Sequence, residues 1–170
     1  MITILVLLLI DHPSLERLGL RLPTAYGASI VLGIGAATVV ILITVAILAG
    51  GQIPPNSVWP RLQSAWGYVI WAFLQEFILQ SFFFHRCKQL YGGRAAVWMA
   101  ATLFALAHLP NAPLTVAALV GALFFCEMFR RYPSIYPLGT VHAMLGLTLA
   151  IIAPDRLLHH MRVGIGYLRY

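Results

Sequence analysis

The stretch WAFLQEFILQSFFFHR, Trp71–Arg86, decides how this chain folds. It is a nearly continuous apolar run, interrupted in its middle by one acidic and two amide side chains. At 100° per residue, five side chains share an arc of about 140° on one helix: Tyr68, Ala72, Gln75, Glu76 and Gln80. An acid within an apolar span is costly, so it normally faces a bundle interior and marks a functional site. We therefore expect a membrane-spanning helix whose polar arc faces other helices.

The composition of the chain is that of an integral membrane protein. Of its 170 residues, 61% are hydrophobic and 9% are charged, against about 25% charged residues in soluble domains. The net charge of +6 comes from scattered Lys and Arg that form no basic face, which argues against nucleic acid as a partner. An excess of positive charge on cytoplasmic loops explains it better. The lipid bilayer is thus the first expected partner.

Hydropathy predicts an all-α fold, a polytopic transmembrane helix bundle that forms one domain over residues 1–170. About five spans are expected, and a short N-terminal apolar segment, Met1–Ile10, precedes them. That segment is shorter than the roughly 20 residues that cross a bilayer, and it lacks the basic leader and cleavage site of a signal peptide. The expected spans are Tyr26–Gly51, Leu62–Phe84, a third that starts near Ala95, Leu114–Phe129 and Ile135–Ala153.

The segments between the spans are predicted to be polar or interfacial. Residues 11–24 form a connector with two proline breakers, residues 52–60 form a loop with an interfacial Trp59, and residues 154–170 form an interfacial tail. The third span is short because the run from His108 to Pro113, HLPNAP, breaks it. Irregular backbone at membrane depth is tolerated only where it is buried or wetted. A polar cavity is therefore expected at the end of this span.

The basic residues divide unequally between the two sides of the predicted bundle. One side collects Arg17, Arg21, Arg86, Lys88, Arg94, Arg130 and Arg131, and the other collects Arg61, Arg156, Arg162 and Arg169. Loops rich in Lys and Arg remain in the cytoplasm. The first side is therefore expected to be cytoplasmic.

Three further residues with reactive side chains are interpreted as structural. Glu127 precedes Arg130 and Arg131 by three and four residues, a spacing that suits an ion pair at the membrane interface. Cys87 and Cys126 lie in or beside apolar runs, and their spacing fits no metal motif. We expect both to be small membrane residues without a disulfide.

Candidate chemistry rests on three ionisable residues within the spans, Glu76, His108 and His142. Either histidine taken alone is explained as well by a hydrogen bond between helices. Together, a carboxylate and two imidazoles from three helices are able to activate water, or to hold a divalent metal such as zinc. Phe104 lies one turn before His108 and is expected to wall the same cavity, and Gly146, one turn after His142, is expected to leave space beside that histidine.

The order of these residues resembles the signature of the CAAX-protease and bacteriocin-processing (CPBP) family of intramembrane proteases, over about residues 72–153. The second motif of that family, Phe-x-x-x-His, is met by Phe104 and His108. The third, His-x-x-x-Asn, is half met, because His142 is followed by Gly146 in the position of the asparagine.

The first motif of the family, Glu-Glu-x-x-x-Arg, aligns with Gln75, Glu76 and Gln80. In the family the first glutamate is the water-activating base, and here that position holds Gln75, whose amide accepts no proton at neutral pH. Glu76 lies about 100° around the helix from it. Gln80 replaces the arginine and removes a fixed positive charge that would orient a carboxylate or a substrate.

The resemblance implies an intramembrane peptidase, in a bacterial inner membrane, that cleaves a peptide near the membrane surface. Its substrate would be a prenylated or sorting-signal C-terminus. Glu76 would be the general base to a water, while His108 and His142 would position that water and stabilise the oxyanion. The expected lining of the substrate cavity is Gln75, Gln80, Phe104, Asn111 and Gly146, and Asn111 would be a further donor at its mouth.

A non-catalytic function on the same scaffold is the alternative. The chain would then be a subunit of a larger membrane complex or a binding protein, as the altered motif positions Gln75, Gln80 and Gly146 suggest. A histidine would ligate a haem or a pigment magnesium, or would hold helices together. A transporter with Glu76 as proton carrier is a third class, and the sequence offers no internal repeat to support it.

Overall fold

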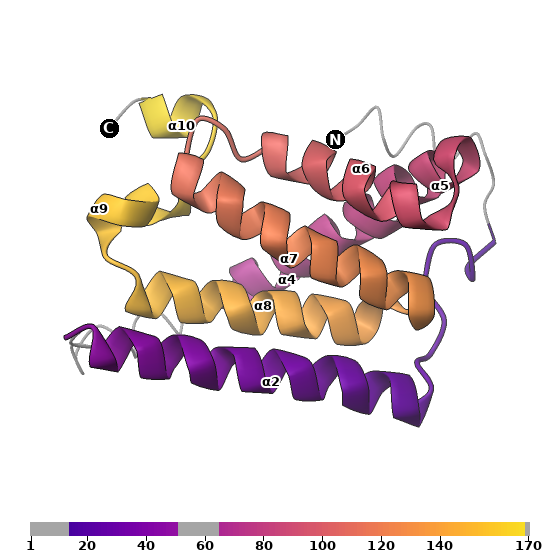
Figure 1. The fold of residues 1–170 in the computed structure, drawn as a ribbon, viewed down its shortest axis with the longest axis horizontal. Coiled ribbons are helices and arrows are strands. Elements are labelled where there is room, and N and C mark those ends of the chain that lie inside the picture. The colour runs from indigo at the N-terminus through magenta and orange to yellow at the C-terminus, as the bar shows by residue number, and fades with distance from the viewer. Residues whose placement is uncertain (1–13, 51–64, 169–170) are drawn as a thin grey trace.

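Every regular element that the structure describes is a helix, as predicted. The computed structural model describes residues 14–50 and 65–168. The helices are α2 (Ala25–Leu48), α4 (Ala65–Phe77), η1 (Ile78–Phe84), α5 (His85–Tyr91), α6 (Gly93–Leu106), α7 (Ala112–Arg131), α8 (Ile135–Ile152), α9 (Asp155–Leu158), η2 (His159–Met161) and α10 (Ile165–Leu168) (Figure 1). The predicted Met1–Ile10 segment, the 52–60 loop, Arg61 and Arg169 lie outside the described residues.

Four of the helical stretches are long and apolar enough to cross a membrane. They are α2, the continuous helix Ala65–Tyr91 formed by α4, η1 and α5, and helices α7 and α8. The second of them runs a full seven-residue segment, α5, beyond the predicted end at Phe84. As predicted, α6 is short: its 14 residues reach about 21 Å at 1.5 Å per residue.

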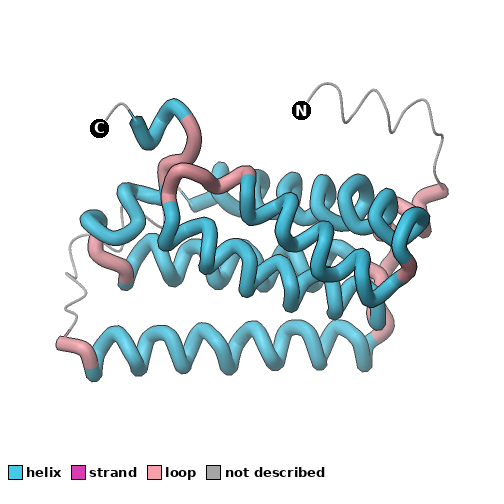
Figure 2. The backbone as a smooth tube through the Cα atoms, turned by 45° about the horizontal axis from the view of Figure 1, so that its top comes forward, coloured by secondary structure: helices cyan, strands magenta, loops and turns pink. Residues whose placement is uncertain are grey.

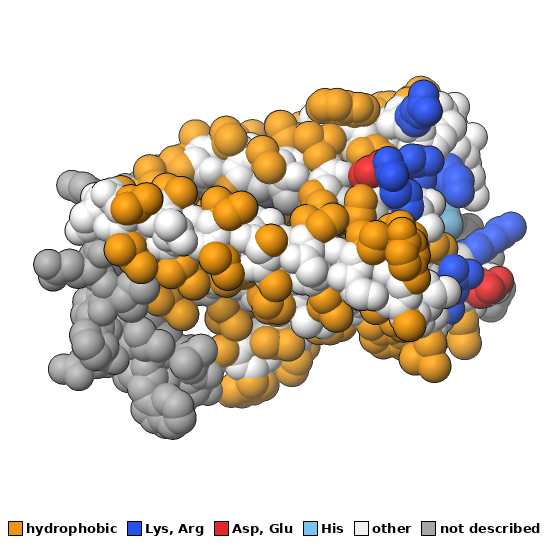
Figure 3. Space-filling view, turned by 60° about the horizontal axis from the view of Figure 1, so that its bottom comes forward, with side chains coloured by type: hydrophobic (Ala, Val, Ile, Leu, Met, Phe, Trp, Pro, Cys, Tyr) orange, Lys and Arg blue, Asp and Glu red, His pale blue; other side chains and the backbone are white. Residues whose placement is uncertain are grey.

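The surface of the bundle is that of a protein in lipid. Apolar side chains cover its sides, and Lys, Arg and acidic side chains gather at one end (Figure 3). Large exposed apolar residues include Val40, Ile41, Ile70, Trp98 and Val120. Exposed apolar side chains have no cost in a hydrocarbon solvent. The chain is therefore an integral membrane protein.

Helix α8 is the central element of the packing. It lies between α2 and α4, while α7 packs on α6 and contacts α8 (Figures 1 and 2). Helix α2 lies at the edge of the bundle, where Gly35 packs against Val141 of α8. In the same way Gly139 of α8 packs against the ring of Phe73 in α4. Glycines at these contacts let helices approach closely.

The end of the bundle where α2 and α6 begin and α5 and α7 finish is called the basic end here (Figures 1 and 3). The connector before α2 is bound there, because Ser134 donates a hydrogen bond to the carbonyl of Arg21 over 2.9 Å. Ser81 of η1 donates to the carbonyl of Leu18 over 2.7 Å. The connector that the sequence predicted is thus fixed against the helix ends.

Two glycines of α2 provide a matched test of the α2–α8 contact. A Cβ on Gly35 would lie 2.5–2.7 Å from both methyl groups of Val141, whereas a Cβ on Gly33 would have nothing within 4 Å. Gly35→Ala should therefore lower the free energy of unfolding by about 1–3 kcal/mol through overpacking. Gly33→Ala should raise it by up to about 1 kcal/mol through helix propensity. Thermal unfolding in detergent measures both, and equal shifts would contradict the packing.

Candidate active site

The centre of the site is a hydrogen bond between α4 and α8. Nδ1 of His142 lies 2.9 Å from Oε1 of Glu76, and the Glu76 side chain is fully buried. A carboxylate oxygen only accepts, so the imidazole Nδ1–H is the donor when Glu76 is ionised. Such a bond fixes both the tautomer and the orientation of the ring. The other ring nitrogen of His142, Nε2, then carries a lone pair and lies on the side of the ring away from Glu76.

The second oxygen of Glu76 is bound within its own helical stretch. Nε2 of Gln80, in η1, donates to Oε2 of Glu76 over 3.0 Å. The two residues are four apart, and both are fully buried. The other end of the amide, Oε1 of Gln80, is buried without a hydrogen-bond partner within the described ranges. Gln80 therefore binds the carboxylate and leaves an acceptor free in the core.

Local helix geometry places these two side chains. The helix changes from α to π winding directly after Phe77 and returns at His85. A π segment bonds i to i+5 and is widest in cross-section of the helix types, and such segments occur at functional sites. Gln80 and Ser81 are buried in it, so polar side chains of this segment face the bundle.

Two aromatic rings hold the imidazole of His142. Phe125 of α7 stacks on it with ring centroids 5.2 Å apart and an angle of 11° between planes. Phe104 of α6 meets it edge to face at 6.3 Å. The rings block rotation of the imidazole and cover it with low-polarity surface. The sequence did not indicate Phe125, since nothing in its spacing separates it from the neighbouring Phe124.

His108 contacts the ring of Phe104, as His142 does. Its ring centroid is 5.0 Å from that of Phe104, and its Nδ1 lies 2.9 Å from the Phe104 carbonyl oxygen. A carbonyl also only accepts, so His108 too carries its proton on Nδ1 and has a free lone pair on Nε2. The ring of Phe104, which was expected to wall the same cavity as His108, contacts both histidines.

The resulting arrangement is two imidazoles with one buried carboxylate behind the first. A zinc site of the predicted kind needs three protein ligands with an open fourth position. Each oxygen of Glu76 already accepts one hydrogen bond, from His142 or from Gln80. Within the described part of the chain, no group of three or more His, Cys, Asp or Glu is arranged to hold a metal ion. The donor set does not fit zinc.

The other predicted residues have different positions. Gln75 is half-buried beside the fully buried Glu76, so the glutamate occupies the centre of the interface. Glu127 binds Arg130 and Arg131 at 2.7 and 2.6 Å, as expected for a structural ion pair. Cys87 and Cys126 are buried free thiols, as expected.

Asn111 does not line this site. It caps α7, accepting from the backbone N–H of Leu114 over 3.2 Å. Its amide nitrogen donates to the carbonyls of Leu158 and Arg162 at 2.8 and 3.1 Å. The expectation of a donor at the cavity mouth is corrected, because both N–H groups already bind the tail. The same tail is held by the Gly164 N–H, which donates to Leu109.

Gly146 also has a different environment from the one predicted. A Cβ built on it would overlap the hydroxyl of Tyr68. The space that the missing side chain leaves is therefore filled by Tyr68 of α4, and it is not open beside His142.

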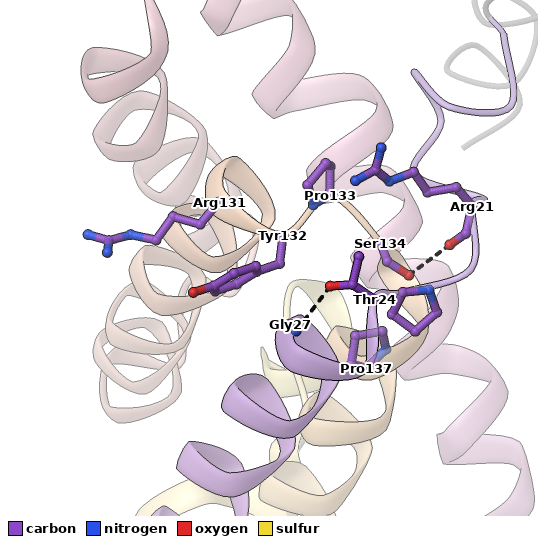
Figure 4. A pocket seen from close by; sticks show the side chains of 9 residues that line it. Arg21, Thr24, Gly27, Arg131, Tyr132, Pro133, Ser134 and Pro137 are labelled. Atoms are coloured by element: carbon purple, nitrogen blue, oxygen red, sulfur yellow. Dashed lines mark hydrogen bonds between the residues drawn. The ribbon is translucent and has the colours of Figure 1, made fainter.

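A separate hollow lies at the basic end, away from this site. Arg21, Thr24, Gly27, Tyr132 and Ser134 are among the residues that line it. Figure 4 shows the side chain of Arg131 directed away from the other labelled residues. Thr24 caps α2 by accepting from Gly27 N–H. The polar groups of this hollow serve the helix ends, and it contains none of the predicted catalytic residues.

Comparison with known proteins identifies one family. The family model described as type II CAAX prenyl endopeptidase Rce1-like matches residues 57–148, more than half of the chain. This range includes Glu76, His108 and His142. No curated protein and no solved structure matches the chain.

Two substitutions of Asn111 separate its functions as a cap and as a tie to the tail. Asn111→Asp keeps the oxygen that caps α7 and removes both N–H donors, whereas Asn111→Ala removes both functions. Both should speed hydrogen exchange in residues 158–164. In the alanine variant alone, the free energy of unfolding should also fall by about 1 kcal/mol, because the cap of α7 is lost. Exchange monitored by mass spectrometry measures this, and unchanged exchange in both variants would contradict the contact.

Proposed function

Because the chain belongs to the Rce1-like family of type II CAAX prenyl endopeptidases, we propose that it hydrolyses a peptide bond within the membrane. The observation that carries the proposal is the 2.9 Å contact of Glu76 with Nδ1 of His142. A buried carboxylate behind an imidazole is the arrangement that makes histidine a base of fixed tautomer. The resemblance predicted from the motif residues agrees with the family.

The division of roles that this geometry supports differs from the one expected from sequence. Glu76 is fully buried and both of its oxygens are engaged, so it acts through His142. Nε2 of His142 takes a proton from water as the water oxygen bonds to the carbonyl carbon. The C–N bond then breaks, and the imidazolium returns the proton to the leaving amine. Glu76 stabilises the imidazolium between these steps.

His108 has a supporting role in the same step. Its Nε2 lone pair accepts the second hydrogen of the water and so positions the oxygen between two imidazoles. A water held by two acceptors presents an oxygen lone pair to the carbonyl carbon. Phe104 and Phe125 exclude bulk water, which strengthens the electrostatics of the His142–Glu76 pair.

The proposed substrate is a peptide whose C-terminal end lies at the membrane surface. The name of the matched family refers to prenylated CAAX ends. A prenyl group would lie in the lipid beside the exposed apolar helices, and it would hold the scissile bond at membrane depth. A sorting-signal peptide without a prenyl group is the second form of the same substrate class.

We also propose that the chain lies in a bacterial inner membrane with the basic end toward the cytoplasm. The helix segments that meet at that end are α5, the start of α6 and the end of α7, and they carry Arg86, Lys88, Arg94, Arg130 and Arg131. Lys and Arg near helix ends favour the cytoplasmic side.

Replacing Glu76 tests the proposed base. Glu76→Gln is similar in shape, but it removes the charge that stabilises the imidazolium and no longer fixes the tautomer. We expect kcat for a prenylated CAAX peptide in proteoliposomes to fall by about 10²–10⁴-fold. The control is Glu127→Gln, which alters a half-exposed ion pair at the basic end and should change kcat less than about twofold, given how little such pairs contribute.

Two results would contradict the proposal. Equal activity of Glu76→Gln and Glu127→Gln would show that the Glu76–His142 pair is not the catalytic base. A wild-type chain that cleaves neither prenylated nor sorting-signal peptides would favour the alternative of a non-catalytic membrane subunit.

Cysteine labelling tests the orientation. The native thiols Cys87 and Cys126 are buried, so the background is low. A membrane-impermeant maleimide added outside spheroplasts should label Leu157→Cys, at the end opposite the basic end. It should label Gln89→Cys, in α5, only after permeabilisation. The reverse pattern would show the opposite orientation.

A further inference from the structure

The proposed site has two acceptors and lacks a donor. His142 and His108 both use their Nδ1–H groups, toward Glu76 and the Phe104 carbonyl. When a neutral imidazole donates from Nδ1, its Nε2 carries no hydrogen. An oxyanion, however, needs preorganised donors at about 2.7–3.1 Å. The two histidines, which were expected to stabilise the oxyanion, therefore provide no hydrogen-bond donor for it before the reaction begins.

The contact of Tyr68 with Gly146 places a hydroxyl donor one turn of α8 from His142. Gly146 follows His142 by one turn of α8, so the two residues lie on the same face. The atom nearest to a Cβ built on Gly146 is the hydroxyl oxygen of Tyr68. The phenol oxygen thus occupies the volume where a side chain at position 146 would begin.

The Tyr68 hydroxyl lies inside the bundle and not at the membrane surface. Tyr68 lies on the arc of α4 that also carries Glu76, two turns earlier, and α4 packs along α8. A tyrosine that anchors a helix at the membrane surface points its hydroxyl to the headgroups. Tyr68 instead directs its hydroxyl to the backbone of α8 and is half-buried.

We propose that the Tyr68 hydroxyl donates a hydrogen bond to the substrate carbonyl oxygen and to the oxyanion that forms on it. Gly146 is its partner, because any larger residue there would displace the hydroxyl. This inference rests on the proposed peptidase function. It assigns Tyr68 as a catalytic residue and gives Gly146 a reason to lack a side chain.

The test compares two tyrosines of the same chain. Tyr68→Phe keeps the ring and removes the donor, and kcat should fall by about 10²-fold with little change in KM, as for other single oxyanion donors. Tyr26→Phe alters an exposed tyrosine at the start of α2 and should leave both constants unchanged. Circular dichroism and thermal unfolding of both variants should match the wild type.

A second pair of variants tests the position itself. Tyr68→Ala removes the ring and should lower kcat at least as much as Tyr68→Phe. Adding Gly146→Asn to Tyr68→Ala places an amide donor in the vacated volume, so kcat should recover by about tenfold, the part of a donor's contribution that imperfect geometry retains.

The outcomes separate the two proposals. A wild-type chain that cleaves its peptide while Tyr68→Phe keeps full kcat would overturn the role of Tyr68 alone. A rise in KM without loss of kcat would also overturn it, because the contact would then serve binding and not the transition state. A wild-type chain with no activity on any peptide tested would overturn both.

Discussion

The buried carboxylate of Glu76 is the constraint on which the rest of this structure depends. A charge in a membrane bundle is tolerated only if its oxygens are bound, because removal from water costs several kcal/mol per ion. Here one oxygen accepts from His142 and the other from Gln80. The bond to His142 fixes the rotation of α4 against α8, and the bond to Gln80 lies within the same helical stretch as Glu76. The helices that hold Phe104 and Phe125 then close around the imidazole.

Much of the fold was predictable because membrane helices satisfy their own backbone. Continuous apolar runs gave α2, α7 and α8 to within a few residues, and HLPNAP predicted the early end of α6. Glu76 was recognisable as the central residue, since an acid among Phe, Ile and Leu is expensive. The extension of α4 through η1 into α5 was not predictable, because His85, Arg86 and Lys88 look like a helix end in the sequence.

The contacts between helices were the part that the sequence did not reveal. Asn111 next to His108 suggested a shared cavity, but its amide binds carbonyls some fifty positions further along the chain. Gly146 suggested space beside His142, but Tyr68 fills that space. The sequence did not single out Phe125, because Phe124 precedes it and only the rotation of α7 decides which of the two rings faces inward. Each of these depends on helix rotation, which hydropathy does not specify.

The π winding of η1 makes the site sensitive to the number of residues in this segment. A π turn holds more residues than the 3.6 of an α-helix, so it behaves as extra chain length stored within a helix. Loss of one residue anywhere in Ile78–Phe84 would return the segment to α phase. The helix after it would keep its facing, because the π segment accommodates that extra residue, but side chains inside the segment, such as Gln80 and Ser81, would rotate around the helix axis and leave their partners. The catalytic face is therefore set by residue count as much as by residue type.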